Sequence, residues 1–408
     1  MFFRLGCSER MEGTVCIMKR ILIIHYSMEL GGAESSLLGL LQSFDYTRYK
    51  VDLLLLNPIG ELLELLPKEV NLIETPKKYR ALVVPLKETI KQKEFGICIA
   101  RICGRFAGNR YKSKTYMIKQ YTHKIAMRFL PSIKDSYDLA ISFIDPHYII
   151  GKKVNAKVKM AWMHTDFSRV NINVSQDRKM WNQIEYVVNV SDSCKECFDK
   201  IHPELERKSI VVENILSANL LLKQADAFSV DEEMENDGSI KLLSVGRFSY
   251  QKNFDNIPDI CKKILKMGLK VKWYIVGYGT DEELIKKKIK EVNVENNVII
   301  LGKKANPYPY MKACDIYVQP SRYEGKCVAV REAQILEKPI VITDYVTSSG
   351  QLTNGLDGIV VPLDNEQCAV QIAKLIKNKE LQKELIKNIK KQNYTNSGEI
   401  EKIYSLME

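Results

Sequence analysis

The sequence predicts an α/β protein made of two doubly wound domains. Apolar strands alternate with helical segments along the chain, which is the pattern of parallel sheets covered by helices on both faces. The pattern runs twice, before and after a polar stretch at 217–239 in which Asp and Glu are crowded. We interpret that stretch as the acidic connection between the domains. With 408 residues, 45% of them hydrophobic, the chain is long enough for two cores.

The composition favours a cytosolic protein without a transmembrane helix or a disulfide framework. No run of 18 apolar residues is present, so no transmembrane helix is predicted. The ten cysteines form no regular framework, which favours reduced thiols and a cytosolic location. Cys194 and Cys197 make a lone C-x-x-C without a second pair at zinc spacing. We therefore place Cys194 in the first turn of a helix capped by Ser191 or Ser193, rather than at a metal.

The first residues of the chain differ from the rest. Residues 1–17 show no periodicity, and they lack the apolar core of a signal peptide. Met18 stands directly before the first strand. We therefore expect residues 1–17 to be a disordered leader or an untranslated extension, with Met18 as the true start.

The N-terminal domain is predicted to span 18–216. Its first strand leads into a Gly-Gly-Ala-Glu loop that contains Gly32, and a helix follows. The glycine pair either lets a ligand approach the backbone closely or only serves a turn with positive φ. His164 directly follows a buried-looking strand, where ligand groups gather in parallel sheets, so it is either a ligand contact or a structural histidine. The strands of this domain are predicted at 21–26, 51–56, 137–143, 158–163, 186–190 and 209–212.

Positive charge is concentrated in one segment of this domain. Residues 77–134 hold fifteen Lys or Arg against two Glu, a net +13, so the rest of a chain that totals +11 sums to −2. Ile, Phe, Tyr and Met are interleaved with these charges. Such a segment suits an anionic surface, which could be membrane lipid, a lipid diphosphate or nucleic acid. The alternative is an ordinary solvated helical face.

The C-terminal domain is predicted to span 240–385. Arg247 and Lys252 share the loop after its first strand, where two cations could neutralise a diphosphate or could be plain surface charge. No Asp-x-Asp is present to hold a metal on phosphates, so we expect these cations and helix N-terminal amides to replace a metal. The strands of this domain are predicted at 241–245, 271–276, 298–301, 315–318, 339–343 and 358–361.

One stretch of this domain, 316–333, carries the strongest functional pattern. A strand runs into a Pro-Ser turn, and Glu324 and Gly325 precede a segment that we predict to be helical. A helix N-terminus after a tight turn presents unpaired backbone N–H groups to an anion. Glu332 follows Glu324 by eight residues, which on a helix places both carboxylates on one face. A phosphate there, with two carboxylates to hold sugar hydroxyls, would make a nucleotide-sugar site.

Residues 241–363 resemble the donor half of the family 4 glycosyltransferases, which are enzymes of the GT-B fold. The order, spacing and strand context of the motifs agree with that family. The N-terminal half is similar through its Gly-Gly-Ala-Glu loop and its strand-end His164. The matching motifs are SVGRFSYQKNFD (244–255), WYIVGYG (273–279), VIILGKKANPYPYMKACDIYVQPSRYEGKCVAVREA (298–333), KPIVITDY (338–345) and DGIVVPLD (357–364).

The resemblance implies two Rossmann-like domains facing across a cleft, with residues 386–408 forming a helix that crosses back to the N-terminal domain. It places Glu324 and His164 against the transferred sugar, and Glu332 on the ribose hydroxyls. This chain has Lys326-Cys327 where the family usually has an aromatic residue and a glycine, so Lys326 adds a cation near the sugar. The implied donor-binding residues are Gly32, Arg247, Lys252, Gly277, Lys303, Gly325, Lys326, Cys327, Val328 and Glu332.

The resemblance also implies an activity. We expect a retaining glycosyltransferase of surface polysaccharide synthesis, metal-independent and without a cofactor, that moves a sugar from a UDP-sugar to a glycan or polyprenyl-diphosphate-linked acceptor. The basic segment 77–134 would hold it on the inner face of the cytoplasmic membrane. Two alternatives stay open: a nucleotide-sugar epimerase of the same fold, and a non-catalytic nucleic-acid-binding protein that uses the basic segment. The paired glutamates and the Arg-Lys loop argue against nucleic acid as a partner.

Overall fold

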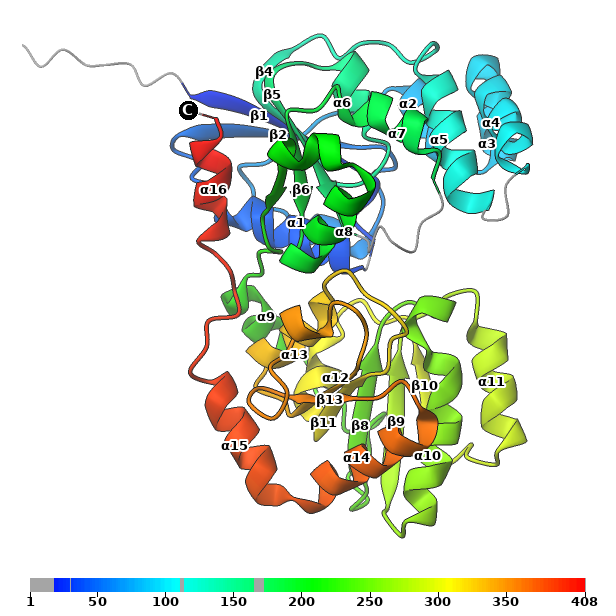
Figure 1. Cartoon of the computed structure of the whole chain (residues 1–408), viewed down its shortest axis with the longest axis vertical. Helices are drawn as coiled ribbons and strands as arrows, with labels where there is room; N and C mark the ends of the chain where they lie inside the picture. Colours follow the sequence, from blue (N-terminus) through cyan, green and yellow to red (C-terminus); the bar gives the residue numbers. More distant parts are fainter. Residues whose placement is uncertain (1–17, 30, 111–113, 165–171, 408) are drawn as a thin grey trace, which may run out of the picture.

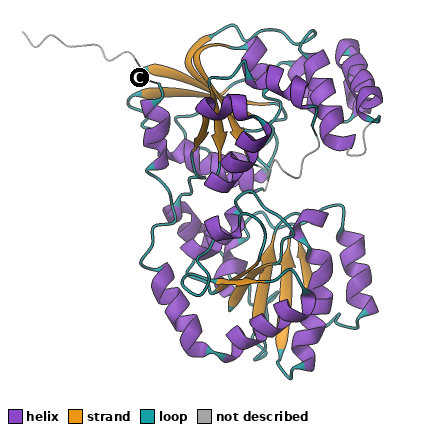
Figure 2. Cartoon of the chain, viewed as in Figure 1, coloured by secondary structure: helices purple, strands orange, loops and turns teal. Residues whose placement is uncertain are grey.

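The computed structural model describes residues 18–29, 31–110, 114–164 and 172–407, so our interpretation of 1–17 lies outside the described residues. Two α/β domains follow one another along the long axis of the molecule, each a parallel sheet with helices on both faces (Figures 1 and 2). The predicted fold class is confirmed.

The N-terminal sheet has seven parallel strands in the order β3-β2-β1-β4-β5-β6-β7. Its interior strand β1 holds an apolar run, Ile21 to Ile24, that is fully buried, as expected for a strand covered on both faces. The strands are β1 (Lys19–His25), β2 (Tyr49–Leu55), β3 (Asn71–Leu72), β4 (Ser136–Ser142), β5 (Asn155–Met163), β6 (Tyr186–Asn189) and β7 (Ser209–Val211).

Helices cover this sheet unequally. One face packs on α1 (Gly32–Ser43) and the final helix, and the other face carries most of the helices. The basic segment forms four of them, stacked at one end of the domain (Figure 1). Ser191 caps α8 by accepting from the Cys194 amide at 3.2 Å, as predicted. The other helices are α2 (Lys77–Val83), α3 (Leu86–Lys91), α4 (Phe95–Gly108), α5 (Lys114–Ala126), α6 (Tyr148–Lys153), α7 (Val174–Trp181) and α8 (Asp192–Ile201).

The C-terminal sheet has six parallel strands in the order β10-β9-β8-β11-β12-β13, again with a core on each face. Its strands are β8 (Ile240–Val245), β9 (Val271–Val276), β10 (Val298–Gly302), β11 (Ile316–Gln319), β12 (Ile340–Thr343) and β13 (Ile359–Val361). Its helices are α10 (Ile257–Lys266), α11 (Glu282–Glu291), α12 (Tyr308–Ala313), α13 (Val328–Ile335), α14 (Asn365–Lys377) and α15 (Lys379–Ile389).

The chain crosses between the domains twice. The first crossing precedes α9 (Ala218–Ala225), which packs against α12 and α13, so the stretch 217–239 is built into the C-terminal domain instead of only connecting the two. Its Leu221, Val230 and Met234 are buried in that core. The second crossing ends in α16 (Glu399–Ser405), which packs on the N-terminal sheet beside α1 (Figure 1). None of the described helices is long and apolar enough to cross a membrane.

Candidate nucleotide-sugar site at the domain junction

Glu324 lies in the loop between β11 and α13, where it is 5% exposed. Lys252 Nζ contacts its Oε1 at 2.6 Å, and Gln251 Nε2 donates to its Oε2 at 3.0 Å. Ser321 Oγ donates to Oε1 at 2.5 Å. Because α13 begins only at Val328, Glu324 stands ahead of the helix, and our expectation that it shares a helical face with Glu332 was wrong. The carboxylate is instead fixed by a cation and two neutral donors.

Lys252 is bound inside the protein and does not simply stand on the surface. Its side chain is 16% exposed, and Nζ also lies 3.6 Å from the sulfur of Cys327. Burial disfavours the charged ammonium, yet the ion pair with the Glu324 carboxylate holds the pKa of Lys252 above its usual value. Burial also raises the pKa of the Cys327 thiol to about 12, so it is a neutral neighbour. Lys252 is therefore a permanent cation that links its own loop to the loop of Glu324.

Glu332 lies on α13, 5% exposed, and accepts a hydrogen bond from Tyr308 OH at 2.9 Å. Ser35, from the N-terminal domain, lies near the same carboxylate and helps to lower its pKa. Burial raises the pKa of Glu332 to about 7, although these hydroxyl groups and the charge of Lys252 oppose the rise. Glu332 is thus a buried acceptor with no directly paired cation among the described residues, which suits neutral hydroxyl donors.

The two domains meet closely at this point. Gly32, the first residue of α1, comes so near α13 that a Cβ built on it would lie 3.3 Å from the Val328 Cβ. A Cβ on Gly325 would lie 2.7 Å from the carbonyl oxygen of His164, so only glycine fits there without a shift. The N-termini of α1 and α13 therefore converge from opposite domains. Helix N-termini favour anions, and two of them frame this junction.

His164 follows β5 and donates from Nε2 to the carbonyl oxygen of Phe143 at 2.8 Å. Burial, with a contribution from His25, lowers the pKa of His164 to about 4, so the ring is neutral near pH 7. A carbonyl can only accept, so Nε2 carries the proton and Nδ1 is left as an acceptor. His164 can accept a hydrogen bond from a sugar hydroxyl, but it cannot offer a charge.

Glu34 was named in the glycine loop but given no role, and the structure places it in the site. Its Oε1 lies 3.4 Å from Nε2 of His25, which is fully buried. Burial opposes ionisation of Glu34, but His25 and the charge of Arg247 hold its pKa below the usual value. Arg247 itself is exposed. The sequence signal for this pair was a histidine at the end of β1, in the position that His164 takes after β5.

Several residues that we expected to bind the donor make other contacts in the structure. Lys326 does not reach toward the site of Glu324: it is 5% exposed and forms an ion pair with Glu213 of the N-terminal domain. Lys303 pairs with Glu61 of the N-terminal domain at 2.6 Å. The Cys327 amide donates to Gln351 Oε1 at 2.7 Å, so it is already occupied. Gly277 serves backbone packing, because a Cβ there would lie 1.9 Å from a carbonyl oxygen of the neighbouring strand end.

The ion pair of Lys326 gives the first prediction. Glu213 also lies 3.6 Å from Arg331, so Glu213→Gln would leave two mostly buried cations without their carboxylate, and we expect a loss of about 2 kcal/mol in unfolding free energy. Lys326→Met keeps the Arg331–Glu213 contact and should cost less than about 1 kcal/mol. Urea unfolding measures both. Nucleotide affinity should be unchanged in Lys326→Met, and a tenfold loss would restore our original placement of this cation near the donor.

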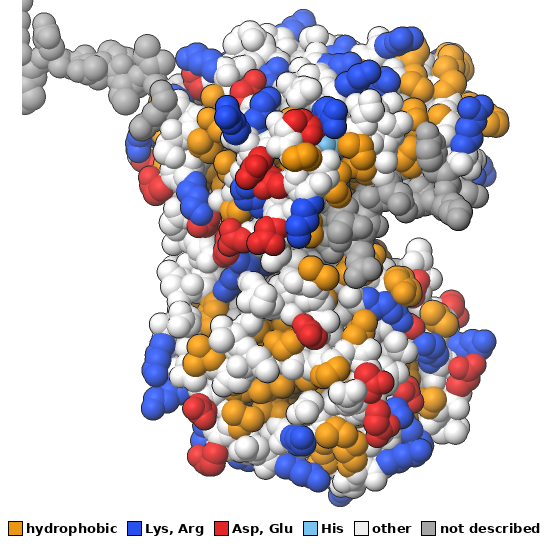
Figure 3. Space-filling model, in the orientation of Figure 1, with side chains coloured by type: hydrophobic (Ala, Val, Ile, Leu, Met, Phe, Trp, Pro, Cys, Tyr) orange, Lys and Arg blue, Asp and Glu red, His pale blue; other side chains and the backbone are white. Residues whose placement is uncertain are grey.

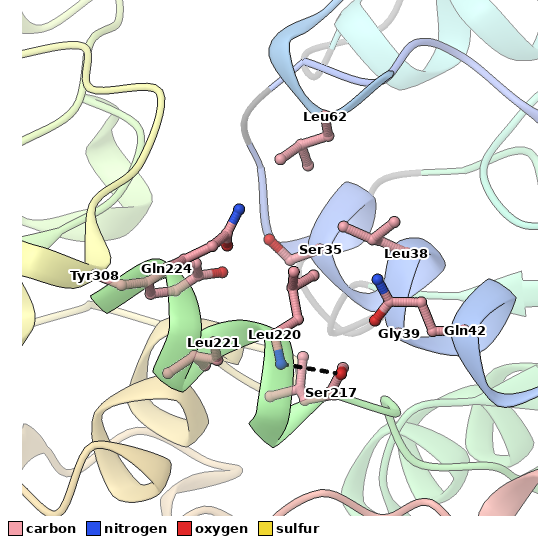
Figure 4. A pocket seen from close by; sticks show the side chains of 11 residues that line it. Ser35, Leu38, Gly39, Gln42, Leu62, Ser217, Leu220, Leu221, Gln224 and Tyr308 are labelled. Atoms are coloured by element: carbon pink, nitrogen blue, oxygen red, sulfur yellow. Dashed lines mark hydrogen bonds between the residues drawn. The ribbon is translucent and has the colours of Figure 1, made fainter. Parts of the chain in front are cut away.

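A pocket opens between the domains, and Tyr308, which donates to Glu332, lines it (Figure 4). Ser35 of α1 lines one side, Leu220 and Gln224 of α9 line another, and Tyr308 lies beside α9. The Tyr308 hydroxyl also donates to Glu332, and the Ser35 hydroxyl lies near the same carboxylate. The buried carboxylate is thus held between both domains, which makes its environment sensitive to how they close.

Two facing Rossmann-like domains with this junction define a GT-B protein. Residues 227–392 match the family model described as "Glycosyl transferases group 1". The chain is 32% identical over 144 residues to the amylovoran biosynthesis glycosyltransferase AmsD of Erwinia amylovora, which is 35% of this chain and 40% of that protein. The C-terminal domain is therefore a group 1 glycosyltransferase domain, and the resemblance to family 4 enzymes is confirmed.

A second relative is the N-acetylgalactosamine-N,N'-diacetylbacillosaminyl-diphospho-undecaprenol 4-alpha-N-acetylgalactosaminyltransferase of Campylobacter jejuni, 28% identical over 156 residues, or 37% of this chain and 42% of that protein. The aligned part thus spans about two fifths of either relative. Among solved structures, HepE of Anabaena in complex with UDP-glucose superposes with a TM-score of 0.68 at 17% identity, over 95% of this chain and 99% of that chain. That likeness extends the shared fold to both domains.

Proposed function

We propose that the protein transfers a sugar from a UDP-sugar to a glycan or polyprenyl-diphosphate-linked acceptor in surface polysaccharide synthesis. The observation that carries the proposal is the arrangement at the junction: Glu324 fixed by Lys252, with Glu332 on the following helix. The names of the relatives support the class of product, and the C. jejuni relative is named for a diphospho-undecaprenol substrate. UDP is favoured because the similar HepE structure contains it.

Each group then has a task in donor binding. Glu332 accepts from the ribose hydroxyls. Arg247 and Lys252 neutralise the diphosphate. Two N–H groups of Lys252 face Glu324 and Cys327, which leaves the third for the phosphate. The N-terminus of α1 at Gly32 approaches the phosphates from the other domain. In this arrangement the cations and helix termini replace a metal, as the sequence predicts.

The mechanism follows from the charges. Departure of the nucleoside diphosphate leaves positive charge on the sugar ring and negative charge on the phosphate. Lys252, Arg247 and the helix N-termini stabilise the phosphate, while the fixed carboxylate of Glu324 faces the ring. We expect the acceptor to attack from the side of the departing phosphate, whose oxygen takes the proton of the acceptor, so that the configuration is retained, as the resemblance to the family 4 enzymes implies.

We place this reaction at the inner face of the cytoplasmic membrane. A polyprenyl-linked acceptor is held in a membrane by its lipid, and the basic helices α2–α5 give the N-terminal domain a surface suited to anionic lipid. This part of the proposal depends on charge and on the class of acceptor.

The donor site is tested by thermal shift with UDP, GDP, ADP and CMP in EDTA. One diphosphate at a hundredfold excess over its Kd should stabilise the protein by about 2.7 kcal/mol. The shift should vanish in Arg247→Ala and persist in Lys270→Ala, which removes an exposed cation just ahead of β9. A shift that needs added Mg²⁺ would contradict metal independence, and no shift with any nucleotide would contradict the donor site.

The reaction itself is tested by NMR of the product. With donor and a lipid-linked acceptor we expect the anomeric configuration of the donor to be kept in the new bond. Inversion would overturn the mechanism. Conversion of the donor sugar without any acceptor would instead establish the epimerase, which is the main alternative on this fold.

A further inference from the structure

Helix α4 exposes a continuous line of large apolar side chains. Phe95, Ile99, Ile102 and Phe106 are 62%, 52%, 45% and 72% exposed. Their spacing of four, three and four residues puts them on one side of the helix, within about 60° of its circumference. Leu86 and Ile90 of the preceding α3 are exposed as well. We call these six residues the apolar ridge.

The apolar ridge is separate from the side of α4 that packs into the core of the domain. The opposite side of α4 packs on α5 at very short range, because a Cβ on Gly104 would lie 2.0 Å from Thr122 Oγ1 and one on Gly108 would lie 2.5 Å from Ile118. Ile97 and Ala100 of α4 are buried in the domain core. The helix therefore has a complete internal face and a second, outward apolar face. Exposed patches of this kind mark an interaction site.

Cations surround the ridge. Arg101 is an exception, since its Nη1 donates to the Val84 carbonyl at 2.5 Å and ties α4 to the end of α2. The opposing charges in this region are Glu88 and Glu94, both only partly exposed. Figure 3 shows hydrophobic and basic side chains side by side at the end of the N-terminal domain where Figure 1 places α4. Within residues 86–110, the exposed cations are Lys87, Lys91, Lys93, Arg105 and Arg110.

We propose that the apolar ridge inserts into the interface of an anionic lipid bilayer, with these cations on the headgroups. The inference deepens the proposed function, because it names the residues that bring the enzyme to a lipid-linked acceptor. An amphipathic helix with basic flanks and Phe and Ile on its apolar side binds in the plane of such an interface. Helix α4 lies on the side of the molecule where the surface between the domains is hollowed (Figures 1 and 3), so insertion of its ridge would bring that side near the bilayer.

Vesicle sedimentation tests the ridge apart from catalysis. Wild-type protein should bind vesicles of phosphatidylglycerol and phosphatidylethanolamine more tightly than vesicles of phosphatidylcholine. Phe95→Ser with Phe106→Ser should weaken binding about a hundredfold, since burying each ring favours the bound state roughly tenfold or more. Leu284→Ser, which alters a 43% exposed side chain on α11 of the other domain, is the matched control and should bind as wild type. Equal binding by the double variant would overturn insertion and leave charge alone as the attraction.

Fluorescence reports the depth of the ridge. Trp162, Trp181 and Trp273 are all buried, so a tryptophan introduced by Phe106→Trp is the solvent-sensitive one. Its emission should shift to the blue with anionic vesicles, and that of Leu284→Trp should not. If the shift occurs without vesicles and light scattering gives a dimer, the ridge binds a second copy and the proposal is wrong. Thermal shift with UDP should be unchanged in every ridge variant, which separates failure of the ridge from failure of the donor site.

Discussion

Replacing Glu332 by Gln is expected to stabilise the protein while it weakens nucleotide binding. Burial raises the pKa of Glu332 to about 7 from an ordinary 4.5, so the folded state holds this proton more tightly than the unfolded state. The free energy of unfolding therefore falls as pH rises from about 4.5 to 7, because Glu332 loses its proton. Above pH 7 the whole loss of about 3 kcal/mol is present. Glutamine removes it, so the free energy of unfolding at pH 8 should rise.

The same substitution removes the charged acceptor that we assign to the ribose hydroxyls. Hydrogen bonds to a charged group contribute about 1.5–3 kcal/mol, so UDP should bind about 10- to 100-fold more weakly. In the wild type, affinity should fall up to tenfold per pH unit below pH 7 as Glu332 is protonated, and Glu332→Gln should flatten this profile between pH 5 and 7.

Calorimetric titration and urea unfolding across pH 5–8 measure both effects. Glu291→Gln on α11 is the control, because its contact with Lys287 is a surface pair that contributes little. Reduced stability in Glu332→Gln together with unchanged UDP affinity would show that the carboxylate is structural.

The fold was predictable from local patterns. Buried parallel strands such as β1 and β8 are short apolar runs, and their alternation with helices identifies the architecture without any long-range information. The stretch 217–239 was less predictable because its acidic composition conceals apolar residues at spacings set by tertiary contacts. Leu221 and Met234 bury themselves against α12 and α13, which no local pattern reveals.

The sequence predicts which residues lie in the candidate site better than it predicts which partners they contact. Glu324, Glu332, Lys252 and Gly32 are brought to one junction, as the motifs indicate. Their partners depend on how two separately folded domains approach one another. Lys326 is an example: the sequence places it beside Glu324, whereas the path of the first interdomain crossing brings Glu213 to it. The spacing of residues along the sequence predicts the structure within one domain, and it does not predict a contact between two domains.

The last prediction concerns the pair that holds Glu324. Lys252→Met should lower the free energy of unfolding by about 3 kcal/mol, because it leaves a carboxylate that is 5% exposed without its cation. Adding Glu324→Gln should recover most of that loss, since the remaining amide needs no counter-charge and Gln251 and Ser321 still bind nearby. Urea unfolding of the two single variants and the double variant gives the coupling energy. Lys288→Met is the control, because its partner Asp255 keeps Arg322 at 3.0 Å.

Across these three variants, kcat should not change in parallel with the free energy of unfolding. Glu324→Gln keeps the shape of the site but removes the charge that faces the sugar, so kcat should fall by about 10²- to 10³-fold with UDP affinity changed little. The double variant should be as stable as the wild type to within about 1 kcal/mol and still inactive. Additive stabilities would mean that the two groups are independent. Recovery of kcat in the double variant would mean that Glu324 only neutralises Lys252. The loss of kcat in Glu324→Gln alone, which keeps Lys252 at the phosphate, separates the role of this carboxylate in the reaction from its role in the fold.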